Sequence, residues 1–221
     1  MALKVVGLGA GGHARVVAEV LRLRGDCEVV GFLDPRPDLH EEMVAAIPVL
    51  GDDSLLPALR KRGVNHFFVG IGGAGDNGPR ARLFDLATAA GMEAVMAIHP
   101  GAMVSPSAKL GAGVTVMAGA IIGTGARLGR NVLVNSGAIV EHDCVIGDHV
   151  HVATGAHIGG TVSVGRLSHI GLGASVRQCV RIGERVLVGA GTVVVSDVPD
   201  DACVVGVPAR PLRAANEEEK H

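Results

Sequence analysis

A strict six-residue period runs through the second half of the chain. Every sixth residue from Ile98 to Val194 is aliphatic, which gives 17 consecutive hexads without a break in phase. The residue four places further on, from Ala102 to Val198, is always small or β-branched. A helix cannot hold a six-residue period on one face, because its own repeat is 3.6 residues. The pattern therefore predicts a stack of short strands that points one aliphatic and one small side chain inward in each hexad.

Glycine follows the aliphatic residue in nine of these hexads, and we expect it where the chain turns between strands. Such hexads resemble the left-handed parallel β-helix of the hexapeptide-repeat acyltransferases. The resemblance implies a triangular prism with 18 residues, or three hexads, in each coil. It also implies the left hand, which the usual crossover rule would not give. We therefore expect residues 98–213 to form an all-β, left-handed β-helix domain.

The first 97 residues follow a different pattern, in which strand-like and helix-like segments alternate. A strand, a glycine turn and an amphipathic helix span residues 3–25; further strands are expected at 28–34 and 65–73, and a second helix at 78–91. This alternation predicts a parallel sheet with helices on its faces. Residues 1–97 are thus expected to form a Rossmann-like α/β half domain, and residues 214–221 a polar tail.

The first strand leads into the sequence Gly7-x-Gly9-x-x-Gly12, and Asp34 ends the next strand 22 residues after Gly12. This is the fingerprint of a dinucleotide site with its ribose-binding acid. The chain holds only about one of the two halves that a dinucleotide needs, so we expect one mononucleotide. Backbone amides at the helix start would bind its diphosphate, and His13 could add a hydrogen bond. The alternative is a glycine turn that only packs the helix on the strand.

Two further segments are expected at the same sheet edge. Asp34-Pro35-Arg36 and the glycines at 70, 72 and 73 end neighbouring parallel strands, so their carboxyl ends should hold the base or ribose, with Gly72 among the contacts. Arg36 could pair with a phosphate, stack on a base or stay in solvent.

Composition excludes several classes of function. The formal net charge is −2 and no Lys/Arg cluster occurs, which argues against nucleic acid and anionic membranes as partners. No apolar run approaches the roughly 20 residues of a membrane span, and no signal peptide is recognisable, so we expect a cytoplasmic protein. The four cysteines show no C-x-x-C spacing and lie in apolar patterns, which favours buried free thiols.

His142 is the strongest candidate for catalysis. It occupies the third hexad position, so its side chain should project outward from the prism. Gly160 stands 18 residues later, one coil away at the strand spacing of about 4.8 Å. An imidazole base beside a backbone N–H suits acyl transfer to an amine, because the base removes the proton and the amide stabilises the oxyanion. Glu141 and Asp143 flank the histidine, and either could orient it.

The other histidines leave a metal site open as an alternative. His149, His151, His157 and His169 follow in the same repeats, and His151 and His169 should stack because they are 18 residues apart. Three converging histidines could bind zinc, as in the γ-class carbonic anhydrases, which also have left-handed β-helices. No further acid or histidine lies in an obviously opposite position, so we expect no metal.

The motifs together resemble a narrower family. "GAGGH" in a Rossmann-like half, "NSGAIVEHDCVIGDHVHV" in the hexads and "VVGVPARPLR" after them are similar to the sugar acetyltransferases of the sialic-acid O-acetyltransferase type. The chain most resembles the enzymes that N-acetylate nucleotide-linked 4-amino-4,6-dideoxysugars, namely those of the UDP-bacillosamine pathway and the GDP-perosamine N-acetyltransferases. The resemblance covers residues 3 to 213 and implies acetyl-CoA as cosubstrate.

The resemblance also implies roles for single residues. His142 would be the general base, Asp143 the acid that orients it, and Asn135 a hydrogen-bonding member of the same cluster. The positions that would contact the thioester and pantetheine arm of acetyl-CoA are His151, Gly160, Leu172 and Ala190. His13 would meet the diphosphate of the sugar nucleotide.

The family is trimeric, which implies a homotrimer with acetyl-CoA in the groove between neighbouring prisms. Pro35-Arg36 departs from the acid that UDP-sugar enzymes tend to carry there, so the nucleobase stays open and guanine is credible. Three alternatives remain: an O-acetyltransferase for sialic acid, a zinc hydratase, and a non-catalytic module that senses sugar nucleotides.

Overall fold

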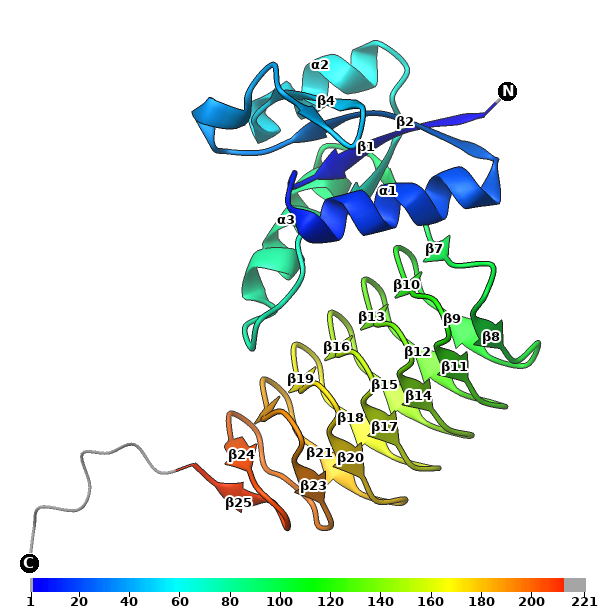
Figure 1. Ribbon diagram of the computed structural model, residues 1–221, viewed down its shortest axis with the longest axis vertical. Helices are drawn as coiled ribbons and strands as arrows, with labels where there is room; N and C mark the ends of the chain where they lie inside the picture. Colours follow the sequence, from blue (N-terminus) through cyan, green and yellow to red (C-terminus); the bar gives the residue numbers. More distant parts are fainter. Residues whose placement is uncertain (1, 213–221) are drawn as a thin grey trace, which may run out of the picture.

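The protein was analysed as a computed structural model, which describes residues 2–212. The expected polar tail, residues 214–221, and position 213 of the expected β-helix lie outside this range. Within it, a three-layer α/β part is followed by a long triangular prism of parallel strands, the left-handed β-helix that the hexads predicted (Figure 1). No helix among the described residues has the length and apolar character needed to cross a membrane.

The N-terminal part is a six-stranded sheet in the order β3-β4-β2-β1-β5-β6, parallel except for β3. Helix α1 covers one face, and α2 and α3 cover the other. The elements are β1 (Leu3–Leu8), α1 (Gly12–Arg24), β2 (Cys27–Leu33), the 3₁₀ turn η1 (Pro37–Leu39), β3 (Met43–Val44), β4 (Ile47–Gly51), the 3₁₀ turn η2 (Asp53–Leu55), α2 (Leu56–Lys61), β5 (His66–Val69), α3 (Gly78–Ala89) and β6 (Glu93–Ala94).

The sequence predicted β1, α1, β2, β5 and α3, but not the hairpin β3–β4 or the short helices. Strands of two to five residues and a six-residue helix are too short to show a hydrophobic period. One detail of the prediction was wrong. β2 and β5 are not neighbours, because β1 pairs with both and lies between them.

The prism has three faces. The first face comprises β7 (Ala97–Ile98), β10 (Thr115–Val116), β13 (Leu133–Val134), β16 (His151–Val152), β19 (His169–Ile170), β22 (Leu187–Val188) and β24 (Cys203–Val205), with β25 (Arg210–Pro211) antiparallel at its edge. The second face comprises β8 (Met103–Val104), β11 (Ile121–Ile122), β14 (Ile139–Val140), β17 (His157–Ile158), β20 (Ser175–Val176) and β23 (Val193–Val194). The third face comprises β9 (Lys109–Leu110), β12 (Arg127–Leu128), β15 (Val145–Ile146), β18 (Ser163–Val164) and β21 (Arg181–Ile182).

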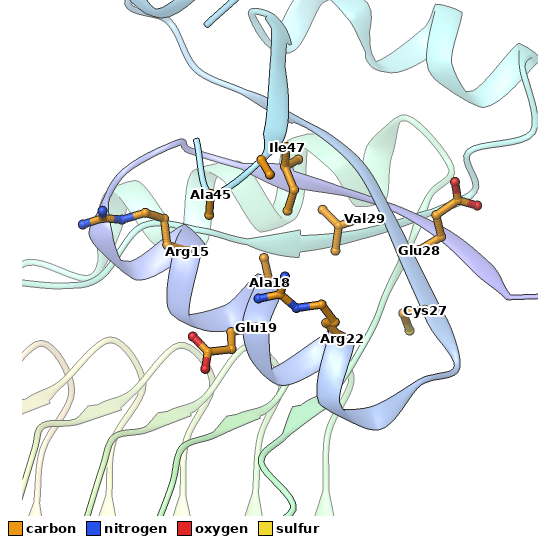
Figure 2. Close-up of a pocket in the computed structure, with 10 residues that line it drawn as sticks. Arg15, Ala18, Glu19, Arg22, Cys27, Glu28, Val29, Ala45 and Ile47 are labelled. Carbon is orange, nitrogen blue, oxygen red and sulfur yellow. The ribbon is translucent and has the colours of Figure 1, made fainter. Parts of the chain in front are cut away.

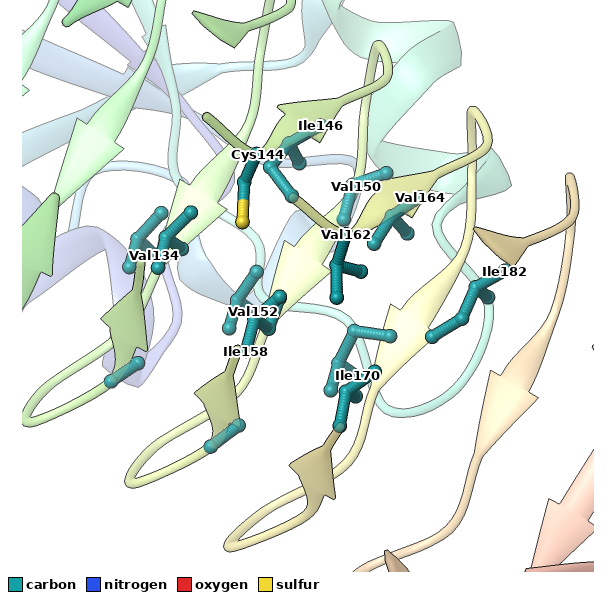
Figure 3. Packing of buried hydrophobic residues seen from close by; sticks show 14 of the residues in the cluster. Val134, Cys144, Ile146, Val150, Val152, Ile158, Val162, Val164, Ile170 and Ile182 are labelled. Carbon is teal, nitrogen blue, oxygen red and sulfur yellow. The ribbon is translucent and has the colours of Figure 1, made fainter. Parts of the chain in front are cut away.

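Each strand pairs with the strand 18 residues later, so the phase predicted from the sequence is confirmed. The inward aliphatic and small residues form one continuous buried core, part of which Figure 3 shows. A fully buried Val or Ile side chain contributes about 1.5 to 3 kcal/mol to stability. The core therefore explains how two-residue strands can hold a fold together.

The glycines that follow the aliphatic residues have a different role from the expected one. The left-handed backbone conformation occurs two positions later, for example at Gly113, Asn131 and Asp143. At Gly111, an added Cβ would lie 2.6 Å from the backbone nitrogen of Arg130 in the next coil. These glycines are required because neighbouring coils approach closely, not because the chain turns there.

The cysteine prediction was partly wrong. All four are free thiols, and Cys144 is buried in the prism core, but Cys179 is exposed and Cys27 and Cys203 are half-buried. Cys179 occupies the fourth hexad position, where the backbone is left-handed (φ 62°) and the side chain stands outside the core. An apolar sequence context alone did not reveal that position.

Candidate active site

His142 stands on the turn that joins the second face to the third, between β14 and β15; we call this stack of turns the His142 corner. Its side chain is 58% exposed, as the third hexad position predicted. Asp143 follows in the left-handed conformation (φ 57°), which brings its carboxylate back to the ring. The Nδ1 atom of His142 lies 3.0 Å from Oδ2 of Asp143. If Nδ1 donates to this carboxylate, Nε2 is left free to accept a proton.

Glu141 does not contact the imidazole. Its Oε2 accepts a hydrogen bond from the backbone N–H of His142 at 3.3 Å. Of the two flanking acids, Asp143 therefore holds the ring.

Gly160 lies against the imidazole from the next coil. A Cβ added to Gly160 would be 2.5 Å from Nε2 of His142, so any side chain there would displace the ring. The Gly160 carbonyl accepts from the N–H of Cys179, whereas the Gly160 N–H donates to no backbone carbonyl within residues 2–212. An unused amide donor beside an exposed imidazole is the pairing that acyl transfer needs.

We expect the two flanking acids to respond differently to substitution. Asp143→Asn should lower kcat by about 10- to 100-fold, because the amide cannot stabilise the protonated ring as a carboxylate does. Asparagine tolerates the left-handed backbone, so the turn should persist. Glu141→Gln is the matched control and should leave kcat within about twofold. Steady-state thiol release measures both variants, and an equal loss in the two would contradict the role of Asp143.

The residues expected near acetyl-CoA do not all lie at the His142 corner. Asn135, Leu172 and Ala190 lie on the turns that join the first face to the second, which we call the Asn135 corner. Asn135 was expected beside His142, and that expectation was wrong within one chain. Its amide Nδ2 lies 3.4 Å from Nε2 of His151, and its Oδ1 accepts from the N–H of Ser136. Seven residues separate it from His142, which is slightly more than one hexad and hence one side of the prism.

His151 lies on the first face and is buried. Its ring packs perpendicular to that of His169 at 4.7 Å between centroids, so the expected stacking of the two is confirmed. The segment after β5 covers it, and a Cβ on Gly73 would lie 3.3 Å from Nδ1 of His151. Burial lowers the pKa of His151 to about 3, helped by His169, Arg80 and His13. His151 is thus neutral near pH 7 and can offer one donor and one acceptor.

The glycine turn has the geometry of a phosphate-binding loop. Gly9 has φ 100°, and a Cβ there would lie 2.5 Å from Cγ2 of Ile71. Helix α1 starts at Gly12 with no side-chain cap, so its first N–H groups remain available. His13 sits in the first turn close to Gly72, and its Nε2 is buried without a partner within residues 2–212. Burial, with the charge of Arg80, lowers the pKa of His13 to about 4.

Asp34 and Arg36 bind each other. Asp34 is buried and its Oδ2 accepts the N–H of Ala10 at 2.9 Å, while Nε and Nη2 of Arg36 bind the two carboxylate oxygens at 2.8 and 3.0 Å. These hydrogen bonds from Arg36, against the opposing effect of burial, lower the pKa of Asp34 to about 2. Asp34 thus ties the glycine turn to Arg36, and neither side chain stands free as the sequence suggested.

Two hollows lie near this turn. A cleft of about 560 Å³ lies between the carboxyl ends of β1 and β2 and helix α3; its lining includes Gly9, Asp34 and Arg36. A second hollow of about 250 Å³, shown in Figure 2, lies between α1, β2 and the β3–β4 turn. No residue expected from the sequence to function lines the second hollow.

Sequence reasoning missed the contacts that dock the N-terminal part on the prism. Arg80 of α3 is 1% exposed, and its guanidinium donates to the carbonyls of Ile71 (2.8 Å) and Asn131 (3.1 Å). Asn77 donates to the carbonyls of Leu167 and Ser168 at 3.2 and 3.0 Å. Charged residues in a helix usually lie in solvent, so no sequence signal marked Arg80.

The docking contacts determine which parts of one chain can meet. Helix α1 packs on the outer side chains of the first face, such as Met117 and Leu133, and α3 bonds to the turns that enter this face. The His142 corner is the vertex opposite the first face (Figure 1). One side of six residues spans up to about 20 Å. A single chain therefore keeps its glycine turn and its own His142 on opposite sides of the prism.

No group of three His, Cys, Asp or Glu side chains lies together in the part of the chain that the structure describes. The zinc alternative has no ligand set there.

Comparisons with known proteins agree with this architecture. The chain matches the PglD N-terminal domain family over residues 4–86 and the bacterial transferase hexapeptide family over residues 125–160. The search of curated proteins gave no match.

Several solved structures are similar along nearly the whole chain. PerB from Caulobacter crescentus, solved in complex with CoA and GDP-perosamine, has 44% identity and a TM-score of 0.89 over 95% of this chain and 97% of that one. The acetyltransferase domain of PglB from Neisseria gonorrhoeae, solved with acetyl coenzyme A, has 40% identity and a TM-score of 0.88 over 96% and 100%. WeeI from Acinetobacter baumannii has 26% identity and a TM-score of 0.84 over 95% and 100%. The chain belongs to the hexapeptide-repeat superfamily, in the family of acetyltransferases that act on nucleotide-linked amino sugars.

Proposed function

We propose that this protein transfers the acetyl group of acetyl-CoA to the C4 amine of a nucleotide-diphosphate-linked 4-amino-4,6-dideoxyhexose. The observation that carries the proposal is the exposed His142 imidazole, held by Asp143 and resting on Gly160. It occurs in a chain 44% identical to PerB, which was solved with CoA and GDP-perosamine. N-acetylation of a nucleotide-linked amino sugar by acetyl-CoA is the activity of the family.

The residues suggest a direct transfer. The neutral amine nitrogen attacks the thioester carbonyl while Nε2 of His142 takes the proton from nitrogen, and the Gly160 N–H donates to the oxyanion. The carbon–sulfur bond then breaks, the amide forms, and the imidazolium returns the proton to the CoA thiolate. A covalent relay has no support, because Cys144 is buried in the core and its thiol donates to the Gly159 carbonyl.

The remaining roles belong to the same proposal. Gly9, Gly12, His13 and Gly72 would surround the diphosphate, with Asp34 and Arg36 as its neighbours. His151, Gly160, Leu172 and Ala190 would contact acetyl-CoA. The last four divide between the two corners within one chain, which supports a homotrimer in which the His142 corner of one copy meets the first face of the next. A cytoplasmic location completes the proposal.

Activity on a panel of substrates tests the proposal. UDP-, GDP- and dTDP-linked 4-amino-4,6-dideoxysugars are offered with acetyl-CoA, and thiol release is followed. Turnover with at least one of them is expected. Acetylation of free sialic acid without a nucleotide would support the O-acetyltransferase instead, and sugar-nucleotide binding without thiol release would support a sensing module.

A charge placed on the glycine turn should block the diphosphate. Gly11 has φ −86°, and a Cβ there would contact nothing within 4 Å, so the site accepts a side chain. Gly11→Asp adds a carboxylate at the start of α1, where it caps the helix but repels an anion. We expect the KM for the sugar nucleotide to rise by about 10- to 30-fold. Gly11→Asn has the same shape without the charge, and an equal rise in that control would rule out the electrostatic explanation.

A further inference from the structure

The cleft of about 560 Å³ has walls suited to a planar ring. Pro35, Ile71, Pro79, Leu83 and Leu86 line it with flat or branched apolar groups. Apolar walls with a few polar groups are typical of small-molecule sites, in which the polar groups decide which ligand fits. The identity of the base therefore depends on which polar side chains in this cleft are free.

Two of the polar side chains are already engaged and two are not. Asp34 and Arg36 bind each other, as described above. Asp53 has a carboxylate oxygen without any hydrogen-bond partner within residues 2–212. Burial, together with the negative charges of Asp52 and Asp34, raises the pKa of Asp53, so its anion lacks compensation. Arg82 is exposed and forms no ion pair in the described part of the chain.

Asp53 and Arg82 enter the cleft from two sides. Asp53 begins η2, directly beyond the carboxyl end of β4, and Arg82 lies on α3, which follows β5. In the sheet order β4-β2-β1-β5, these elements flank the ends of β2 and β1, and both η2–α2 and α3 cover the same sheet face (Figure 1). A ring between them would present one edge to a carboxylate and another to a guanidinium.

Guanine matches that pair of groups. Its N1–H and 2-amino group form two adjacent donors that suit a carboxylate, and its O6 and N7 form two adjacent acceptors that suit an arginine. Uracil and thymine offer a single N–H between two carbonyl oxygens, which a carboxylate would repel. Adenine has an acceptor at N1 and no donor at C2.

We propose that Asp53 and Arg82 make the cleft specific for guanine, with Asp53 accepting from N1–H and the 2-amino group and Arg82 donating to O6 and N7. A turn of the Asp53 carboxylate about its Cβ–Cγ bond brings both oxygens to the ring edge. This assignment rests on the proposed function, because it names the nucleotide that carries the amino sugar.

Binding titrations of the full chain with free GDP, IDP, XDP and UDP test the assignment. IDP lacks the 2-amino group, so the unaltered protein should bind GDP at least about 10-fold more tightly than IDP or UDP. Asp53→Asn supplies an amide that donates to the C2 carbonyl of xanthine, and it should gain XDP binding while losing GDP binding, each by about 10-fold. Such a gain cannot come from misfolding. Asp52→Asn, an exposed neighbour that keeps its capping oxygen for Ser54, should leave the order GDP over XDP unchanged.

Arg82 has its own arm in the same titrations. Arg82→Met should weaken GDP binding by about 10-fold, and Arg62→Met, an exposed arginine outside the cleft, should not. UDP binding as tight as GDP binding, or an Asp53→Asn variant that still prefers GDP to XDP, overturns the guanine assignment. If thiol release occurs with a UDP- or dTDP-linked amino sugar, the proposed function survives that failure. If no sugar nucleotide supports thiol release, the proposed function fails as well.

Discussion

Replacing His142 by asparagine is expected to lower kcat by about 10²- to 10⁴-fold, the usual contribution of a general base. The amine can attack only as it loses a proton, and no other imidazole lies at the His142 corner to accept it. Asparagine keeps a polar side chain beside Asp143 and Gly160 but cannot take up a proton. Because the side chain is 58% exposed, folding should be unaffected.

Binding separates this loss from damage to the site. Titration with CoA and with the sugar nucleotide should give dissociation constants within about threefold of those of the unaltered protein. His157→Asn is the matched control, since His157 is an exposed histidine on the second face of the prism. Its kcat should not change. A His142→Asn variant with near-normal turnover would remove His142 from the role of base.

The prism was predictable because its signal is long. Seventeen hexads repeat one inward pair of residues, so Ile98 to Val198 could be aligned with strand positions before any coordinates were known. The same count put His142 outside the core and Gly160 beside it, and both positions are confirmed. The hairpin β3–β4 gave no such signal, because two paired residues cannot establish a period.

The site was less predictable, because its parts depend on packing between distant segments. The saturation of Asp34 by Arg36 and Ala10 follows from how the glycine turn meets η1, which no local pattern encodes. The burial of His151 depends on the segment around Gly73 lying across the first face. The separation of Asn135 from His142 was within reach, since seven residues in a six-residue repeat lead to the next corner.

Mixed trimers should recover activity that neither parent has. The glycine turn and His142 of one chain lie on opposite sides of its prism, so the proposed reaction needs the corner of one copy and the nucleotide site of the next. One parent carries His142→Asn. The other carries Gly11→Asp with Gly12→Glu, two carboxylates that favour the helix start but repel the diphosphate. Each parent alone should retain about 1% of the activity or less, measured with sugar nucleotide well below its KM.

In a mixed trimer, one of the three interfaces combines an intact His142 corner with an intact nucleotide site. Trimers that carry both variants, isolated through two different tags, should therefore show about one third of the unaltered activity, a gain of about 30-fold or more over either parent. If base and nucleotide site instead worked within one chain, every chain in the mixture would lack one of them and activity would stay at the parental level. The experiment thus distinguishes a shared site from a self-contained one without assuming any distance between copies.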